Sequence, residues 1–204
     1  MGRVRKRHAA IGIAALLAAA LAMPASASAL TITIGDDNQY APPSATQDLG
    51  AGSFDWEWGP GGSGTFEEHN VVQDEGLFDS GEPVLNRAGG FTVTASAGSF
   101  PYFCEIHVGM VGEVSVRPVT ASARAGDGIR VAWADATTTT GSSYDVRYKA
   151  GKKWKPWRKK TSKPAGTFGR NGKPVKLRKK VKLQARSRAG SATSEWSPVL
   201  KLER

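Results

Sequence analysis

Long hydrophobic runs are scarce in this chain of 204 residues. The only long one covers residues 9–23, and fifteen mostly small residues are short for spanning a bilayer. It follows four basic residues within positions 3–7 and precedes Ala27-Ser28-Ala29, a small-x-small cleavage motif. This pattern predicts a secretory signal peptide over residues 1–29, with a membrane anchor as the alternative. No cysteine near the cleavage site offers a lipid attachment point, so we expect a soluble protein that is secreted or associated with the cell envelope.

Cysteine is almost absent, because Cys104 is the only one. It cannot form a disulfide within its own chain. In an oxidising compartment an unpaired cysteine indicates an intermolecular disulfide, a reactive thiol or a metal ligand. An inert buried thiol is the remaining reading of Cys104, and its neighbours in the sequence weigh against it.

Helical periodicity is also missing outside residues 1–29. Short segments instead alternate apolar and polar residues with a period of two, which is typical of half-buried strands. They cover residues 30–34, 54–58, 91–94 and 114–116 in the first half and 128–133, 144–148 and 181–185 in the second. Glycine-rich turn segments separate them. The sequence therefore predicts an all-β protein built from sandwiches or barrels.

Acidic and basic residues divide the chain into two halves. Residues 30–117 contain thirteen acidic and two basic side chains, a net charge of −11, whereas residues 118–204 contain five acidic and twenty-two basic ones, a net charge of +17. The change falls at Arg117-Pro118. We therefore expect a signal peptide at 1–29, one domain at 30–117 and a second at 118–204.

A heptapeptide in the first domain brings three metal-binding side chains together. Cys104, His107 and Met110 follow the spacing C-x2-H-x2-M, and Gly109 allows the loop to bend. A thiolate, an imidazole and a thioether are the donors of an electron-transfer copper site, which needs one more histidine. His69, before the strand-forming residues 71–72, is the remaining histidine of the domain. Zinc is the alternative metal, although it rarely takes a thioether, and simple core packing is the alternative to any metal.

Residues 30–117 resemble the plastocyanin/azurin-like cupredoxins, the blue copper proteins, with a loop spacing like that of amicyanin. The matching segments are Tyr40-Ala41-Pro42, Gly52–Trp58, His69-Asn70-Val71, Phe78–Gly81 and Tyr102–Gly112. The resemblance implies a Greek-key sandwich that holds one mononuclear copper ion. It assigns His69, Cys104 and His107 as equatorial ligands and Met110 as the axial ligand.

Two further residues concern the support of these ligands. Asn70 matches the asparagine that follows the first ligand in the family and braces the loop, an arrangement that fixes ligand geometry. Its family partner is a Ser or Thr directly after the cysteine, but here that residue is Glu105. A carboxylate that faces the metal would favour Cu(II), whereas one that points to solvent would have little effect. Ile106 also replaces the usual proline.

The ligand inventory favours electron transfer over catalysis. One histidine, His8, lies within the predicted signal, so the remaining two are both used by one site. Copper oxidases and nitrite reductases need further histidine-rich centres, and we therefore expect no enzymatic activity. The main hypothesis is an exported electron carrier that exchanges electrons with a redox protein partner. A copper-sequestering or delivery protein and a surface adhesion protein with a structural copper site are the alternatives.

The second half resembles a fibronectin type III domain, an immunoglobulin-like sandwich, over residues 118–204. It differs at Val181, where that family has a corner tyrosine. Its basic residues gather in two clusters, at 152–160 and 176–188, the first with interleaved tryptophans. An anionic cell-wall polymer, a membrane surface or an acidic redox partner is the expected target, because export makes nucleic acid a poor one. The alternatives are a solvated positive face and a contact with the acidic first domain.

Overall fold

The computed structural model of the protein describes residues 28–121, 128–169 and 180–202. Within these residues it contains sixteen strands, one short 3-10 turn and no α-helix, so the predicted all-β fold is confirmed. No helix of the described residues is long and apolar enough to cross a membrane. The predicted hydrophobic signal segment and part of the second basic cluster, residues 176–179, lie outside the described residues.

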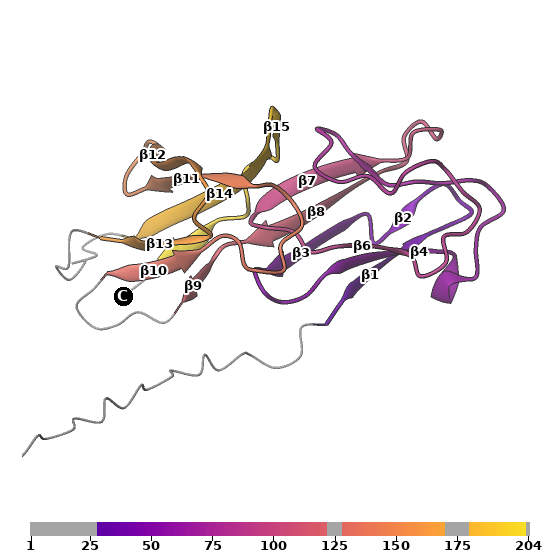
Figure 1. Ribbon diagram of the computed structural model, residues 1–204, viewed down its shortest axis with the longest axis horizontal. Helices are drawn as coiled ribbons and strands as arrows, with labels where there is room; N and C mark the ends of the chain where they lie inside the picture. The colour runs from indigo at the N-terminus through magenta and orange to yellow at the C-terminus, as the bar shows by residue number, and fades with distance from the viewer. Residues whose placement is uncertain (1–27, 122–127, 170–179, 203–204) are drawn as a thin grey trace, which may run out of the picture.

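Residues 30–117 form two four-stranded sheets that face each other across one core (Figure 1). The first has the order β2-β1-β4-β6 and the second the order β3-β8-β7-β5. Pairing is parallel between β1 and β4 and between β3 and β8, and antiparallel elsewhere. The elements are β1 (Leu30–Ile34), β2 (Tyr40–Ala41), β3 (Ser44–Asp48), β4 (Phe54–Trp58), the 3-10 turn η1 (Pro60–Gly62), β5 (Val72–Gln73), β6 (Phe91–Val93), β7 (Gly98–Phe103) and β8 (Val111–Arg117).

The alternating pattern of β4 explains how this core forms. Phe54, Trp56 and Trp58 are completely buried, while the intervening Asp55 and Glu57 are only partly buried. Successive strand side chains point to opposite faces, so one strand delivers three aromatic rings to the core. Trp56 meets Tyr102 of the opposite sheet edge to face, with ring centroids 5.2 Å apart. Burying such rings is a main source of the stability of this half.

Residues 119–202 form a three-stranded and a five-stranded sheet around a second buried cluster. The smaller sheet has the order β13-β10-β9; the larger has the order β12-β11-β14-β15, and β16 also pairs with β14. Trp133, Val146 and Leu183 occupy the centre of this core. The strands are β9 (Val119–Ala121), β10 (Ile129–Ala132), β11 (Ser143–Lys149), β12 (Lys155–Thr161), β13 (Ala165–Phe168), β14 (Val181–Ala189), β15 (Ala192–Thr193) and β16 (Leu200–Leu202).

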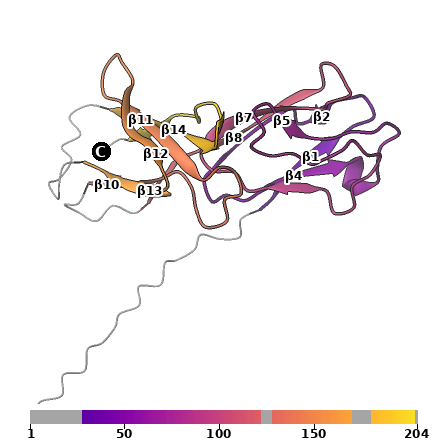
Figure 2. The ribbon, with the colours of Figure 1, turned by 45° about the horizontal axis from the view of Figure 1, so that its top comes forward.

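The two groups of strands lie end to end along the long axis of the molecule, as Figures 1 and 2 show. They touch where β7 begins. The Ala97 amide donates to the Trp133 carbonyl at 2.7 Å, and Ser99 forms an isolated β-bridge with Glu195. Ala97 belongs to the second core although it precedes β7 in the first group. The residues predicted to bind a metal lie at the opposite end of β7.

Candidate metal centre

Cys104 follows the last residue of β7, and the loop that it begins leads directly into β8. The Cys104 amide donates to the Met110 carbonyl at 3.1 Å, and the Met110 amide donates to the His107 carbonyl at 3.1 Å. Gly109 adopts a φ of 88°, a conformation that side chains disfavour. These contacts fold residues 104–110 into a compact connection that turns His107 back toward Cys104.

His69 reaches the same place from the segment before β5. Its backbone exchanges two hydrogen bonds of 3.0 Å with Val84, and its carbonyl accepts from Trp58 Nε1 at 3.0 Å. His69 itself forms only an isolated bridge, and the regular strand that follows it begins at Val72. Because Val72 pairs with Phe103, His69 lies beside the end of β7.

The three side chains converge on one point. Cys104 Sγ lies 3.5 Å from His107 Nδ1 and 3.9 Å from His69 Nδ1. A metal ion about 2.3 Å from sulfur and about 2.0 Å from nitrogen, at trigonal angles, would hold those atoms about 3.7 Å apart. The ligand atoms of all three residues lie within 4.8 Å of one another, so this group could bind a metal ion. A set of one sulfur and two nitrogens does not by itself identify the metal.

Burial determines the protonation state of His69. The residue is completely buried, and its Nε2 has no hydrogen-bond partner within the described part of the chain. Burial lowers the pKa of His69 from 6.5, and nearby His107 lowers it further, while Glu67 and Asp36 act in the opposite direction. The imidazole is thus favoured in its neutral form, which is the form that binds metals.

Glu67 fixes the second histidine, a role that the sequence analysis missed. Its Oε2 lies 3.0 Å from His107 Nε2. A ligand histidine typically gives its other ring N–H to a carboxylate or carbonyl, which leaves the first nitrogen free for the metal. This contact therefore orients Nδ1 of His107 toward Cys104. The only available signal was the position of Glu67, two residues before His69.

Asn70 ties the His69 segment to the Cys104 loop. Its Oδ1 accepts from the Glu105 amide at 3.0 Å, and its Nδ2 donates to Glu105 Oε2 at 2.7 Å and to the Gly81 carbonyl at 3.0 Å. The predicted bracing role of Asn70 has a matching geometry. Glu105 is exposed overall, but its carboxylate accepts a hydrogen bond from Asn70. The longer glutamate side chain thus takes the place of the Ser or Thr hydroxyl expected at this position.

Met110 is buried at the end of the loop, with 2% of its surface exposed. It packs in the same core as Cys104, and its backbone bonds hold the loop closed. The Met110 side chain is thus buried in the same core as Cys104. The role of Met110 as an axial ligand remains a prediction from the sequence.

Exposed apolar side chains lie on the segments that carry the site, and we call them the apolar rim. The large hydrophobic side chains that are most exposed among the described residues all belong to the loop, the start of β8 and the segments beside His69. They are Phe66, Leu85, Ile106, Val108 and Val111. An apolar rim around a partly exposed His107 is suited to contact with another protein.

Comparison with known protein families and with curated proteins found no match for this chain.

Proposed function

We propose that this protein is an exported mononuclear copper protein that carries electrons. The observation that carries the proposal is the convergence of Cys104 Sγ with the Nδ1 atoms of His69 and His107. Met110, buried at the end of the same loop, adds a thioether, and this set of donors favours copper over zinc. The resemblance of residues 30–117 to cupredoxins supports the same reading.

A preformed site keeps the structural change during electron transfer small. Copper bound there supplies the Cu(I)/Cu(II) couple. The donor residues lie in three segments: the end of β7, the loop to β8 and the bridge at His69. Asn70 and Glu67 hold these segments in place through contacts of 2.7–3.0 Å. Cys104 and His69 therefore cannot rearrange freely when the charge at the centre changes.

Electron exchange is proposed through His107, the more exposed of the two histidines. The apolar rim around it would bring a redox protein partner close without the cost of desolvating many charges. We propose no catalytic activity, because His69 and His107 are the only histidines after the predicted signal and both serve one site. The basic residues 118–204 are proposed to hold the protein at the cell envelope or against a partner.

The test adds Cu(II) to the exported form of the protein. We expect an intense visible thiolate-to-copper band at one equivalent, which disappears on reduction and returns on reoxidation. Cys104→Ser should abolish the band, whereas Ser115→Ala, a substitution elsewhere in the same sandwich, should keep it. A colourless protein would contradict the copper assignment.

A second measurement separates the carrier from a sequestering or delivery protein. Rapid and reversible exchange of electrons with a small redox protein supports the carrier. A site that holds Cu(I) very tightly and exchanges electrons slowly supports sequestration. The apolar rim around His107 favours the first outcome.

A further inference from the structure

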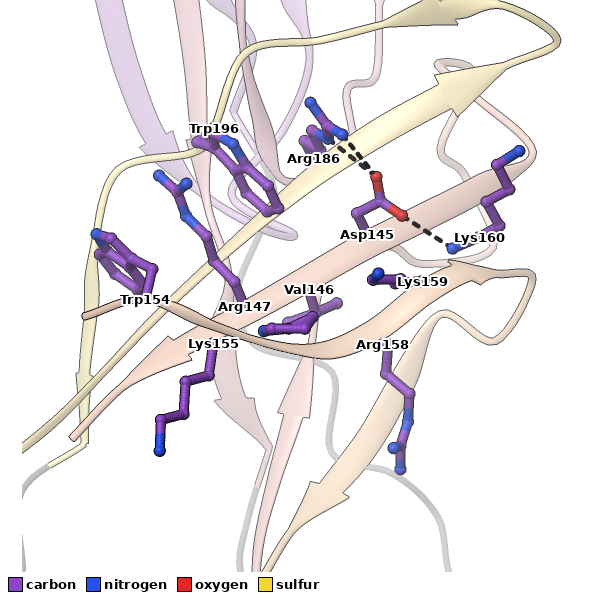
Figure 3. A pocket seen from close by; sticks show the side chains of 11 residues that line it. Asp145, Val146, Arg147, Trp154, Lys155, Arg158, Lys159, Lys160, Arg186 and Trp196 are labelled. Atoms are coloured by element: carbon purple, nitrogen blue, oxygen red, sulfur yellow. Dashed lines mark hydrogen bonds and ion pairs between the residues drawn. The ribbon is translucent and has the colours of Figure 1, made fainter.

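A groove on the five-stranded sheet gathers cations and tryptophans (Figure 3). It has a volume of about 600 Å³, within the range of ligand sites. We call it the basic groove. It is formed by β11, β12, β14 and the segment before β16, and its principal side chains are Arg147, Trp154, Lys155, Lys159, Arg186 and Trp196.

Two tryptophans hold the guanidinium of Arg147 between them. The Arg147 Cζ lies 4.6 Å from the ring centroid of Trp154 and 4.0 Å from that of Trp196. Arg186 covers Trp196 as well, at 4.7 Å. Figure 3 shows the order Trp154, Arg147, Trp196 and Arg186 across the sheet. Each stacked pair contributes a favourable cation–π interaction.

Hydrogen bonds fix the guanidinium groups of both arginines. Arg147 donates to Gln184 Oε1 from Nε at 3.1 Å and from a terminal nitrogen at 2.7 Å. Arg186 Nε donates to Asp145 Oδ2 at 3.0 Å, and the Lys160 amide donates to Asp145 Oδ1 at 2.9 Å. Such fixed guanidiniums lose little freedom when a ligand binds.

Positive charge is in large excess in the groove. Asp145 is the only carboxylate among its lining residues, and it is already bonded to Arg186 and Arg188. Within the described residues no ion pair engages Lys155, Arg158 or Lys159. Burial lowers the pKa of Arg147 from its ordinary value, and the charge of Arg186 lowers it further. An anion bound in the groove would reduce the repulsion among these positive charges.

The arrangement of the cations favours a chain-like ligand. Lys155 and Lys159 follow one another along β12, whereas Arg147 and Arg186 lie on the neighbouring strands β11 and β14. Arg147 and Arg186 cover the faces of Trp196, so this ring is not available for stacking by a nucleic-acid base.

We infer that the basic groove binds a linear anionic polymer, one that carries a phosphate or a carboxylate on successive units. Arg147 and Arg186 contact the charges at the bottom of the groove, and Lys155 and Lys159 contact those that follow along β12. This inference makes the proposed envelope association specific, and it does not depend on the copper site.

The test measures binding of polyphosphate and of alginate, a polyuronate, to the full exported chain at several salt concentrations. The variant Lys155→Gln with Lys159→Gln removes two charges from the groove. Arg130→Gln with Lys201→Gln removes the same charge from exposed positions that do not line it. We expect at least a tenfold loss for the groove variant and less than threefold for the control. If about 0.7 counterion is released per phosphate contacted, as for single-stranded nucleic acids, the salt slope should also fall by about 1.4.

The two polymers distinguish phosphate from carboxylate as the recognised group. Equal losses in both variants would overturn the inference, because they would mean diffuse attraction. Tighter binding of poly(dT) than of either polymer, or binding to phosphatidylglycerol vesicles alone, would also overturn it, because the ligand would then be a nucleic acid or a membrane. Self-association at low salt that the groove variant removes would overturn it as well, because the groove would then bind a second copy of the chain. The visible copper band of both variants should stay unchanged, so failure here and failure of the copper proposal are separate results.

A third variant examines the stacked arginine. Arg147→Lys keeps the charge but loses the planar group held by Trp154 and Trp196. We expect several-fold weaker polymer binding with an unchanged near-ultraviolet circular dichroism spectrum. Undiminished affinity in this folded variant would show that the fixed guanidinium does not contact the polymer.

Discussion

Replacing Asn70 by alanine should destabilise the protein by about 3 kcal/mol. The side chain is completely buried and makes three hydrogen bonds, two to Glu105 and one to the Gly81 carbonyl. Each such bond contributes about 1 kcal/mol to stability, and unsatisfied groups left behind add to the loss. For a domain whose free energy of unfolding is about 5–15 kcal/mol, this is a large fraction.

A double-mutant cycle with Glu105→Ala makes the prediction sharper. Glu105→Ala removes only the carboxylate contact of 2.7 Å, since its amide still donates to Asn70 Oδ1. We expect it to cost about 1 kcal/mol. The double variant should then cost little more than Asn70→Ala alone, because residues in one network are not additive. Urea unfolding of the metal-free protein measures all three changes.

Either of two results would contradict the bracing role of Asn70. An Asn70→Ala loss below about 1 kcal/mol would mean that the three bonds do not support the fold. Strictly additive losses in the double variant would mean that Asn70 and Glu105 act independently. In either case the bridge between the His69 segment and the Cys104 loop would not be the brace that the distances indicate.

Three further predictions concern the same region. Trp58→Phe removes the donor to the His69 carbonyl, so unfolding should become easier by about 2 kcal/mol in a denaturant titration, and an unchanged midpoint would count against this support. Gly109→Ala places a methyl group at a φ of 88°, where no other atom lies within 4 Å of it. The melting temperature should therefore fall only through backbone strain of about 1–2 kcal/mol. The pKa of His69 in the folded protein lies below 6.5, so the unfolded state binds more protons as the pH falls through 6.5. The metal-free protein should therefore lose stability by up to about 1.4 kcal/mol per pH unit, until the pH falls below the folded pKa. A curve of unfolding free energy against pH that His69→Gln leaves unchanged would contradict this assignment.

Alternation made two strands of the first half predictable to the residue. Leu30–Ile34 and Phe54–Trp58 were predicted as strands and are β1 and β4 with the same bounds. Their apolar residues fill the core, so pattern and packing agree. By contrast β12 (Lys155–Thr161) carries mostly charged residues and a proline, and the sequence showed it only as a basic cluster. Its pairing with β11 keeps it in the sheet despite that composition.

The candidate site was predictable where ligand chemistry constrains the residue type. Cys104, His107 and His69 are the only residues of their types in the first half, and the structure brings them together. The contacts that support them were not predictable. Glutamates are common in this acidic half, and nothing in the sequence distinguishes Glu67 from its neighbours as the partner of His107. Contacts between residues 35 positions apart, such as Asn70 with Glu105, depend on the register of the sheet.

Metal analysis and X-ray absorption on the protein purified from the cells that make it decide whether the site holds copper. We expect one copper ion per chain, with one sulfur and two imidazole nitrogens as its nearest ligands and loss of the sulfur contribution in Cys104→Ser. Zinc in the isolated protein, or a copper ion surrounded only by nitrogen and oxygen, would contradict it.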